Sequence, residues 1–386
     1  MNPVVYLDNN ATTKVAPEVV EAMLPFFTER YGNASSMHAF GGAIHADLER
    51  AREKVAALIH AAPSEIVFTS CGSESDNMAI FGAVERLGRD TTIITTRVEH
   101  PAVLQPCREL RDRGYRVIEV GVMADGTLDI DAYSAALATP GPKFVSMMWA
   151  NNETGVVFPI QVAAEKALAA GAVFHTDAVQ AVGKLAEVDM SRVPVNMLSL
   201  SGHKLHAPKG VGALYIRRGT RLKPFLRGGH QERGLRAGTE NVPYIVGLGK
   251  AAELAMDEMR DDIPRIAAMR DRLEAGLLKC PDAIVNGSRR MRLPNTLNIS
   301  FEYIEGEAIL YHLSDAGICA SSGSACTSGS LEPSHVIRAM GVPFTAVHGS
   351  IRFSFSKYNT ESDVVRVLAV VPGVVDKLRK LSPFVK

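Results

Sequence analysis

Short apolar segments alternate with helix-like segments along most of the 386 residues, and this alternation is the feature that most constrains the fold. The helix-like segments include residues 161–171, which Gly171 closes as a C-cap. Such alternation predicts βαβ units, and therefore an α/β fold with a large, mostly parallel sheet covered on both faces. The segments predicted to be buried strands are residues 66–70, 92–96, 144–150, 172–177 and 197–202.

The pattern changes near residue 260. Residues 252–278 carry many charges at a spacing that predicts one or two long amphipathic helices. We therefore predict a large domain over residues 13–260 and a smaller α+β domain made of residues 261–386 together with residues 1–12, which carries the loop of Cys326. The elements expected in the smaller domain are strands at 297–303 and 350–356, a helix around 306–316 and a final helix after Thr360.

Composition limits the function. Lys plus Arg and Asp plus Glu both number 42, and this balance argues against a broad nucleic-acid-binding face or a basic membrane patch. No window approaches 18 apolar residues, and the first residues show no signal-peptide pattern. The five cysteines form no CxxC pair, which is typical of reduced thiols. We expect a cytoplasmic protein that acts on a small molecule, with no nucleic-acid or membrane partner.

The first candidate site feature follows the strand at 66–70. Gly72 lets the backbone approach a ligand, and Ser73 stands where we expect a helix N-cap. Free N–H groups, the helix dipole and a hydroxyl would together bind a phosphate group. An ordinary helix cap explains the same residues. The segment does not match a P-loop, and 210–215 lacks the third glycine of a dinucleotide-binding fingerprint.

Two charged residues also follow apolar strands. Asp177 ends the strand at 172–177, where a carboxylate needs a partner, and a pyridinium nitrogen would be one. An N-cap aspartate is the alternative. Lys204 follows the strand at 197–202, where partial desolvation would lower its pKa and suit Schiff-base chemistry. A lysine that extends to solvent at the sheet edge is the alternative, and Lys209 is a competitor in a Pro/Gly turn.

Three further residues complete the candidate set. His100 follows the strand at 92–96, where a histidine can stack on a cofactor ring or transfer protons. Cys326 lies in SSGSACTSGS, a Ser/Gly tract in which we expect an accessible nucleophilic thiol, although an incidental exposed thiol is the alternative. Arg352, in the strand at 350–356, needs an anion, which is either a substrate carboxylate or an internal salt-bridge partner.

Together these segments resemble the cysteine desulfurases, within the aspartate-aminotransferase fold family of pyridoxal-phosphate enzymes (fold type I). The resemblance covers almost the whole chain and is closest to the NifS type, which serves nitrogen fixation. One departure is Ala34, where the family often has proline, and Ser73 stands where threonine is common. The motifs that carry the resemblance are YLDNNATT (6–13), YGNASSMH (31–38), TSCGSESDN (69–77), EHPAV (99–103), ANNETG (150–155), HTDAVQAVG (175–183), SGHKLHAPKGVG (201–212), RGGHQERGLRAGTEN (227–241), LPNTLNISF (293–301), SSGSACTSGSLEPSHV (321–336) and IRFSFSKY (351–358).

The resemblance implies a role for each matching residue. Lys204 would hold pyridoxal 5′-phosphate covalently, and Cys326 would accept the sulfur. The other implied positions are Asp177 at the pyridine nitrogen, Gln180 at the ring hydroxyl, His100 stacked on the ring, Asn152 at ring or substrate, Gly72, Ser73, Ser201 and His203 at the phosphate, Gly202 at the cofactor, Thr239 and Arg221 at the phosphate of a neighbouring subunit, and Asn33 and Arg352 at the substrate carboxylate.

The resemblance also implies a reaction and partners. L-Cysteine would give L-alanine and a persulfide on Cys326, and a homodimer would pass that sulfur to an iron–sulfur scaffold protein. No resident metal is expected, and Cys326 is at most a transient iron–sulfur ligand. A selenocysteine lyase or an aminotransferase on the same scaffold is the alternative, although an aminotransferase has no use for an exposed cysteine. A non-catalytic sulfur-relay protein should have lost Lys204 or Asp177, and both are present.

Overall fold

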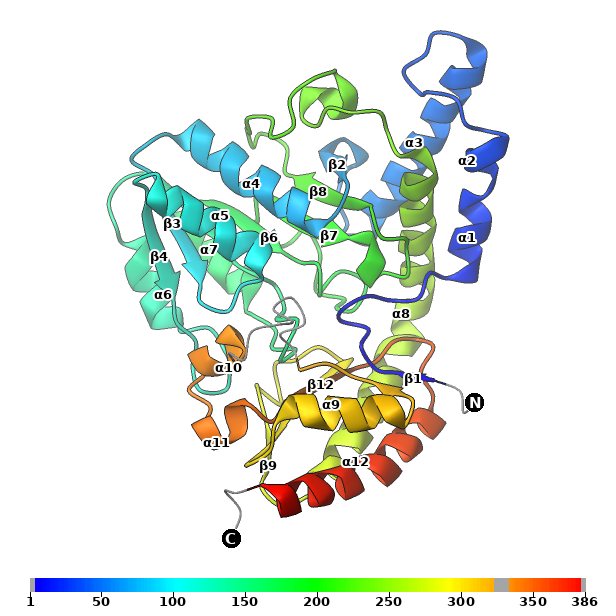
Figure 1. Cartoon of the computed structure of the whole chain (residues 1–386). Coiled ribbons are helices and arrows are strands. Elements are labelled where there is room, and N and C mark those ends of the chain that lie inside the picture. The colour runs from blue at the N-terminus through cyan, green and yellow to red at the C-terminus, as the bar shows by residue number, and fades with distance from the viewer. Residues whose placement is uncertain (1–3, 323–332, 383–386) are drawn as a thin grey trace.

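The structure, a computed structural model, describes residues 4–322 and 333–382. A seven-stranded sheet with helices on both faces fills one part of the molecule, and a three-stranded sheet with its own helices lies beside it (Figure 1). The strands are β1 (Val5–Tyr6), β2 (Ile66–Thr69), β3 (Thr92–Thr96), β4 (Arg116–Val120), β5 (Lys143–Ser146), β6 (Val173–Asp177), β7 (Met197–Ser201), β8 (Gly212–Ile216), β9 (Ala283–Val285), β10 (Thr296–Phe301), β11 (Ile318–Cys319) and β12 (Ser350–Ser354).

Helices connect most of these strands. Short 3₁₀ helices also occur, and the one at Gly202–Lys204 (η2) directly follows β7. The α-helices are α1 (Pro17–Met23), α2 (Pro25–Thr28), α3 (Ala39–Leu58), α4 (Gly72–Leu87), α5 (Pro101–Asp112), α6 (Ile130–Leu137), α7 (Ile160–Ala169), α8 (Val242–Leu277), α9 (Gly306–Asp315), α10 (His335–Ala339), α11 (Phe344–Val347) and α12 (Glu361–Leu381).

The large sheet has the strand order β2-β8-β7-β6-β5-β3-β4. Strands β4, β3, β5, β6 and β7 pair in parallel, whereas β8 is antiparallel to both of its neighbours. The predicted mostly parallel α/β sheet is therefore confirmed. Gly171, which the sequence marked as the cap after α7, has a φ of 66°, the left-handed conformation that glycine adopts without strain.

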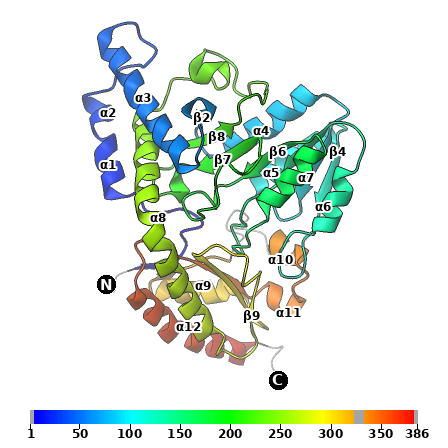
Figure 2. The same ribbon diagram turned by 180° about the vertical axis from the view of Figure 1, so that it is seen from behind.

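Consecutive residues of each strand point to opposite faces of the sheet, so the sheet separates two apolar cores. Ile94 and Val145 belong to the core that α3, α6, α7 and α8 cover. Ile93 and Phe144, one position earlier, belong to the core under α4 and α5. Helices α4 and α5 lie in front of the sheet in Figure 1, and α6 and α7 lie in front of it in Figure 2.

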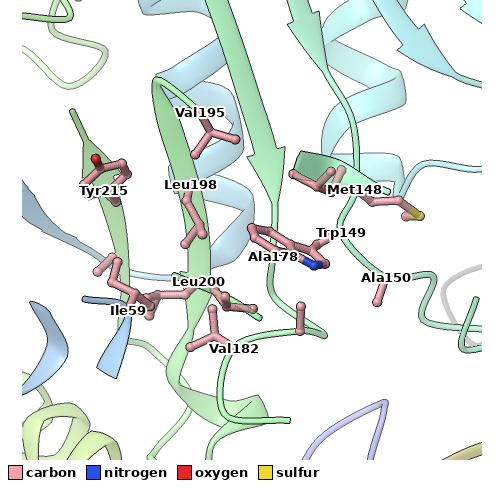
Figure 3. Packing of buried hydrophobic residues seen from close by; sticks show 14 of the residues in the cluster. Ile59, Met148, Trp149, Ala150, Ala178, Val182, Val195, Leu198, Leu200 and Tyr215 are labelled. Carbon is pink, nitrogen blue, oxygen red and sulfur yellow. The ribbon is translucent and has the colours of Figure 1, made fainter. Parts of the chain in front are cut away.

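The first of these cores extends to the carboxyl ends of the strands. Leu198 and Leu200 of β7 are buried and lie between Tyr215 of β8 and Trp149, which follows β5 (Figure 3). All four side chains are at most 3% exposed. This packing gives the loops at the carboxyl edge a rigid support.

The second sheet, with the order β12-β10-β9, is antiparallel and has a separate core. Val5 and Leu7 from the N-terminal segment are part of this core, and β1 pairs in parallel with β11. A single helix, α8, extends across the boundary predicted at residue 260 and contributes to both cores. The division into domains at that residue stays a prediction.

Among the described residues, no helix combines the length and apolarity that a membrane crossing requires.

Candidate active site

A cavity of about 310 Å³ lies at the carboxyl edge of the large sheet, where the ends of β2, β5, β6 and β7 meet β12 of the second sheet. This is the edge at which open parallel sheets bind ligands. The predicted residues that line the cavity are Gly72, Ser73, His100, Asn152, Asp177, Gln180, Ser201, His203, Lys204 and Arg352.

Four predicted residues do not line the cavity, and one lies outside the described residues. Asn33 is exposed, and its Oδ1 accepts a hydrogen bond from the Ser35 N–H at 2.9 Å. Arg221 and Thr239 are exposed as well, so a role toward a neighbouring subunit stays a prediction. Gly202 is buried, and a Cβ there would lie 2.9 Å from Val211 Cγ1, so close packing against β8 explains this glycine. Cys326 falls between the described ranges 4–322 and 333–382.

The start of α4 forms one wall of the cavity. The helix begins at Gly72 after the extended residue Cys71, so the expectation that Ser73 is the N-cap is wrong. Cys71 makes no side-chain capping hydrogen bond, which leaves the N–H groups of the first turn for an anion. A Cβ on Gly72 would lie 2.8 Å from Val179 Cγ2, and glycine therefore allows this close approach. Ser201 Oγ is buried and has no hydrogen-bond partner among the described residues.

Asp177 ends β6 with its side chain 7% exposed. Its Oδ1 accepts a hydrogen bond from the Val179 N–H at 2.9 Å, which shapes a turn, so the alternative of a helix N-cap does not apply. Burial raises the pKa of Asp177, while His100, the Val179 N–H and Lys204 lower it by a smaller amount. A cationic ring nitrogen would stabilise the ionised form.

Lys204 is half-buried in η2 and points toward the N-terminal segment. Its Nζ donates hydrogen bonds to the carbonyl oxygens of Asn10 and, at 2.7 Å, Ala11. Backbone carbonyls thus hold the amine at the cavity wall. An amine held in this way can react with a carbonyl compound in the cavity.

Two histidines flank the lysine and the carboxylate. His100 is the N-cap of α5, and its Nδ1 accepts the Ala102 N–H at 3.1 Å. Burial lowers the pKa of His100, so the neutral ring is favoured and can accept a proton. Burial, with the charges of Lys204 and Lys209 next, lowers the pKa of His203 to about 4. His203 Nδ1 lies 3.2 Å from Thr12 Oγ1.

Arg352 enters from β12 and is 2% exposed. Its Nη2 lies 2.7 Å from Asp8 Oδ1, and its Nη1 donates to the Asn152 carbonyl at 2.9 Å. The internal salt bridge that the sequence left open is therefore present. Arg352 nevertheless lines the cavity, and its Nε has no partner among the described residues.

Sequence reasoning missed several groups around this cavity. Asp76 lines it at 1% exposure, and burial followed by the charge of Asp177 raises the pKa of Asp76 well above its ordinary value. An acidic residue in the first turns of a helix that begins at the site was the available signal. Asn10 contributes its backbone carbonyl, for which the sequence gives no signal. Among the described residues, no group of three or more His, Cys, Asp or Glu could hold a metal ion.

These features fit pyridoxal phosphate. The start of α4 and the unpartnered Ser201 hydroxyl suit its phosphate, the buried Asp177 suits its ring nitrogen, and Lys204 suits its aldehyde. Residues 5–367 match the family of class-V aminotransferases. The chain belongs to this family of pyridoxal-phosphate enzymes and, within it, to the cysteine desulfurases, as the following relatives indicate.

A cysteine desulfurase of Gluconacetobacter diazotrophicus is 61% identical over 383 residues, which cover 98% of this chain and 95% of the relative. The cysteine desulfurase NifS of Azotobacter vinelandii is 58% identical over 382 residues, which cover 98% of this chain and 94% of that relative. Among solved structures, a NifS-like protein superposes with a TM-score of 0.91 at 39% identity and covers 97% of this chain and 100% of its own.

Proposed function

We propose that this cysteine desulfurase binds pyridoxal 5′-phosphate at Lys204, removes sulfur from L-cysteine and leaves it on Cys326 as a persulfide. The observation that carries the proposal is the meeting of Lys204, Asp177, His100 and Arg352 around one cavity. These residues come from β6, β12 and the segments that follow β3 and β7, so the fold places an amine, a buried carboxylate, a neutral imidazole and a guanidinium together.

The residues around the cavity divide the binding of the cofactor among them. Lys204 would hold its aldehyde carbon and Asp177 its ring nitrogen, while Gln180, Asn152 and His100 would contact the ring. The start of α4 would hold the phosphate, with Gly72, Ser73, Ser201 and His203 as its partners. When bound, pyridoxal phosphate supplies an electron sink for negative charge at the substrate Cα.

The side chains around the cavity then handle the substrate and its protons. Arg352 binds the carboxylate of L-cysteine, for which its fixed donors are well suited. The Lys204 amine would accept the Cα proton and later return a proton to the product. His100, whose burial favours the neutral ring, accepts or donates a proton near the sulfur.

Sulfur transfer to Cys326 balances without an external oxidant. The Cys326 thiolate attacks the substrate sulfur, an S–S bond forms and the substrate C–S bond breaks. The two electrons of that C–S bond stay with the carbon skeleton, which takes up protons and leaves as L-alanine. The product on the enzyme is the Cys326 persulfide.

We further infer a cytoplasmic homodimer in which Arg221 and Thr239 reach the phosphate of the neighbouring subunit. Both residues are exposed in the single chain, as such a role requires. The persulfide passes to an iron–sulfur scaffold protein, and the motifs of the NifS type favour cluster assembly for nitrogen fixation. When a reductant takes the place of the acceptor protein, the sulfur of L-cysteine would instead be released as sulfide.

The test is the release of L-alanine and sulfide from L-cysteine with a reductant, together with the visible spectrum. Cys326→Ala should keep the cofactor band and lose both products. The matched control is Cys71→Ala, because Cys71 is the thiol that lines the described cavity. Full activity of Cys326→Ala would instead indicate a lyase that eliminates sulfur directly. Loss of activity only in Cys71→Ala would move the acceptor role to Cys71.

A further inference from the structure

Lys184 is a half-buried lysine to which the proposed reaction assigns no role. It follows Gly183, whose φ of 73° turns the chain after β6, and a Cβ at Gly183 would lie 2.3 Å from Leu205 Cδ2. Glycine is thus required for this turn, and the turn directs Lys184 toward the site. Lys184 Nζ donates a hydrogen bond to Gln180 Oε1 at 2.7 Å.

This hydrogen bond determines how the Gln180 amide is oriented. Because Oε1 accepts from Lys184, the amide nitrogen Nε2 lies on the other side, where it donates to the Asn10 carbonyl at 2.9 Å. Nε2 carries two protons, so one N–H remains for a ligand. Gln180 is 5% exposed and lines the active-site cavity. If the amide were reversed, two acceptor oxygens, Oε1 and Asn10 O, would face each other.

The position of Lys184 favours a geometric role over a role for its charge. Lys184 lines a second cavity of about 70 Å³, which Lys204 also lines. Burial, with the positive charges of Lys204 and Arg352, lowers the pKa of Lys184 to about 7. The charged form is therefore only partly populated at neutral pH, whereas the charged and neutral amines both have an N–H to donate.

We propose that Lys184 is a positioning residue that fixes the Gln180 amide so that an N–H group, and not the carbonyl oxygen, meets the ring oxygen of the bound cofactor. This inference rests on the proposed binding of pyridoxal phosphate. An N–H donor stabilises the anionic form of that oxygen, and Lys184 thereby sets the pH at which the cofactor changes its protonation state.

The experiment is a pH titration of the visible absorbance of the holoenzyme, for the wild type, Lys184→Met, Gln180→Ala and the double variant. Each single variant should raise the apparent pKa of the absorbance change by about one unit, the effect of one lost hydrogen bond to a charged group. The double variant should titrate like Gln180→Ala, because Lys184 acts only through Gln180.

Two matched variants sharpen the test. Lys209→Met removes the same charge from an exposed lysine without a Gln180 contact and should titrate as the wild type does. Lys184→Arg keeps an N–H donor at this position and should also titrate like the wild type. The inference is overturned if the two single shifts add in the double variant, or if Lys184→Met titrates like the wild type. A wild-type protein that develops no visible band with added pyridoxal phosphate would overturn the proposed function itself.

Discussion

The buried arginines Arg52 and Arg352 each have a carboxylate partner, yet the two pairs differ in how completely their hydrogen-bonding groups are satisfied. Arg52 of α3 and Glu232 form two parallel hydrogen bonds of 2.8 and 2.9 Å, and both residues are under 9% exposed. The Ile66 carbonyl and the Phe68 N–H complete this pair. Arg352 reaches Asp8 with one nitrogen only, and Asp8 remains 21% exposed on its side chain.

The surroundings of the two pairs differ in the same way. Around the active-site cavity, Asp76 Oδ1, Ser201 Oγ and Arg352 Nε are buried without a hydrogen-bond partner among the described residues. Neither Arg52 nor Glu232 has such an atom. Since unpartnered buried polar atoms cost stability, the three that surround this cavity indicate binding capacity held for a ligand. The Arg52–Glu232 pair stabilises the fold, whereas the Arg352–Asp8 pair is available to a substrate.

The largest effect should come from Glu232→Gln. The change removes the buried anion of the Arg52 guanidinium and leaves only the exposed Glu49, so we expect a loss of roughly 3–5 kcal/mol in the free energy of unfolding. Activity per folded molecule should not change. Glu49→Gln is the matched control, because Glu49 pairs with the same arginine but is 43% exposed, and it should cost under about 1 kcal/mol. Urea denaturation measures both, and equal losses would refute the distinction between buried and exposed partners.

Arg352→Met should affect catalysis more than stability. Loss of charge-assisted bonds to the substrate carboxylate should lower kcat/KM for L-cysteine roughly 100-fold, or about 2.7 kcal/mol. Asp8→Asn removes only the internal partner and should change kcat/KM by less than ~3-fold. Steady-state kinetics on purified holoenzyme decide this. If both variants lose activity equally, Arg352 and Asp8 form a structural pair like Arg52 and Glu232.

Glu99, next to His100 in the sequence, makes the free energy of unfolding depend on pH. It is fully buried, its Oε2 has no partner among the described residues, and burial raises its pKa to about 8. Because of the raised pKa, the folded state keeps a proton on Glu99 that the unfolded state releases. The free energy of unfolding therefore falls as the pH rises from about 4.5 toward 8. From pH 6 to 7.5 the loss should be on the order of 2 kcal/mol. Glu99→Gln should flatten this part of the stability profile in urea melts, and an unchanged slope would count against the buried proton.

The smallest effect is expected for Ser201→Ala. Because the hydroxyl has no partner in the described structure, its removal should change the stability of the apoprotein by less than about 0.5 kcal/mol. Affinity for pyridoxal phosphate should fall about 5-fold, the worth of one hydrogen bond near 1 kcal/mol. Fluorescence titration of the apoprotein measures the affinity. An unaltered affinity would show that this hydroxyl does not contact the phosphate.

The parts of the site that sequence reasoning predicted share a local signal. Asp177 and His100 are polar residues just after apolar strands, and strand ends of a parallel sheet meet at one edge, so their proximity follows from the pattern. Arg352 was predicted to need an anion, but the sequence could not decide whether that anion is Asp8 or a substrate carboxylate. Only the fold brings residues 8 and 352 together.

Other features of the structure could not be predicted from the sequence. The carbonyls of Asn10 and Ala11 hold Lys204, and any residue type would present the same carbonyl groups. The antiparallel direction of β8 was equally invisible, because GALYI is buried throughout and looks the same whichever way the strand runs. Lys184 was hidden for another reason, since a lysine in a turn is ordinarily solvated.

The pairing of the N-terminal segment has a consequence for biosynthesis. Residues 5–11 provide the carbonyls that hold Lys204, but Val5 pairs with Ile318 and the Asn9 side chain with the Ser354 carbonyl. Residues 5–9 must therefore wait until residues 318 and 354 have been synthesised, roughly 15–60 seconds at the usual rates of translation. The pocket around Lys204 cannot be complete before residue 354 has been synthesised, so a ligand that needs the whole pocket must bind after that point.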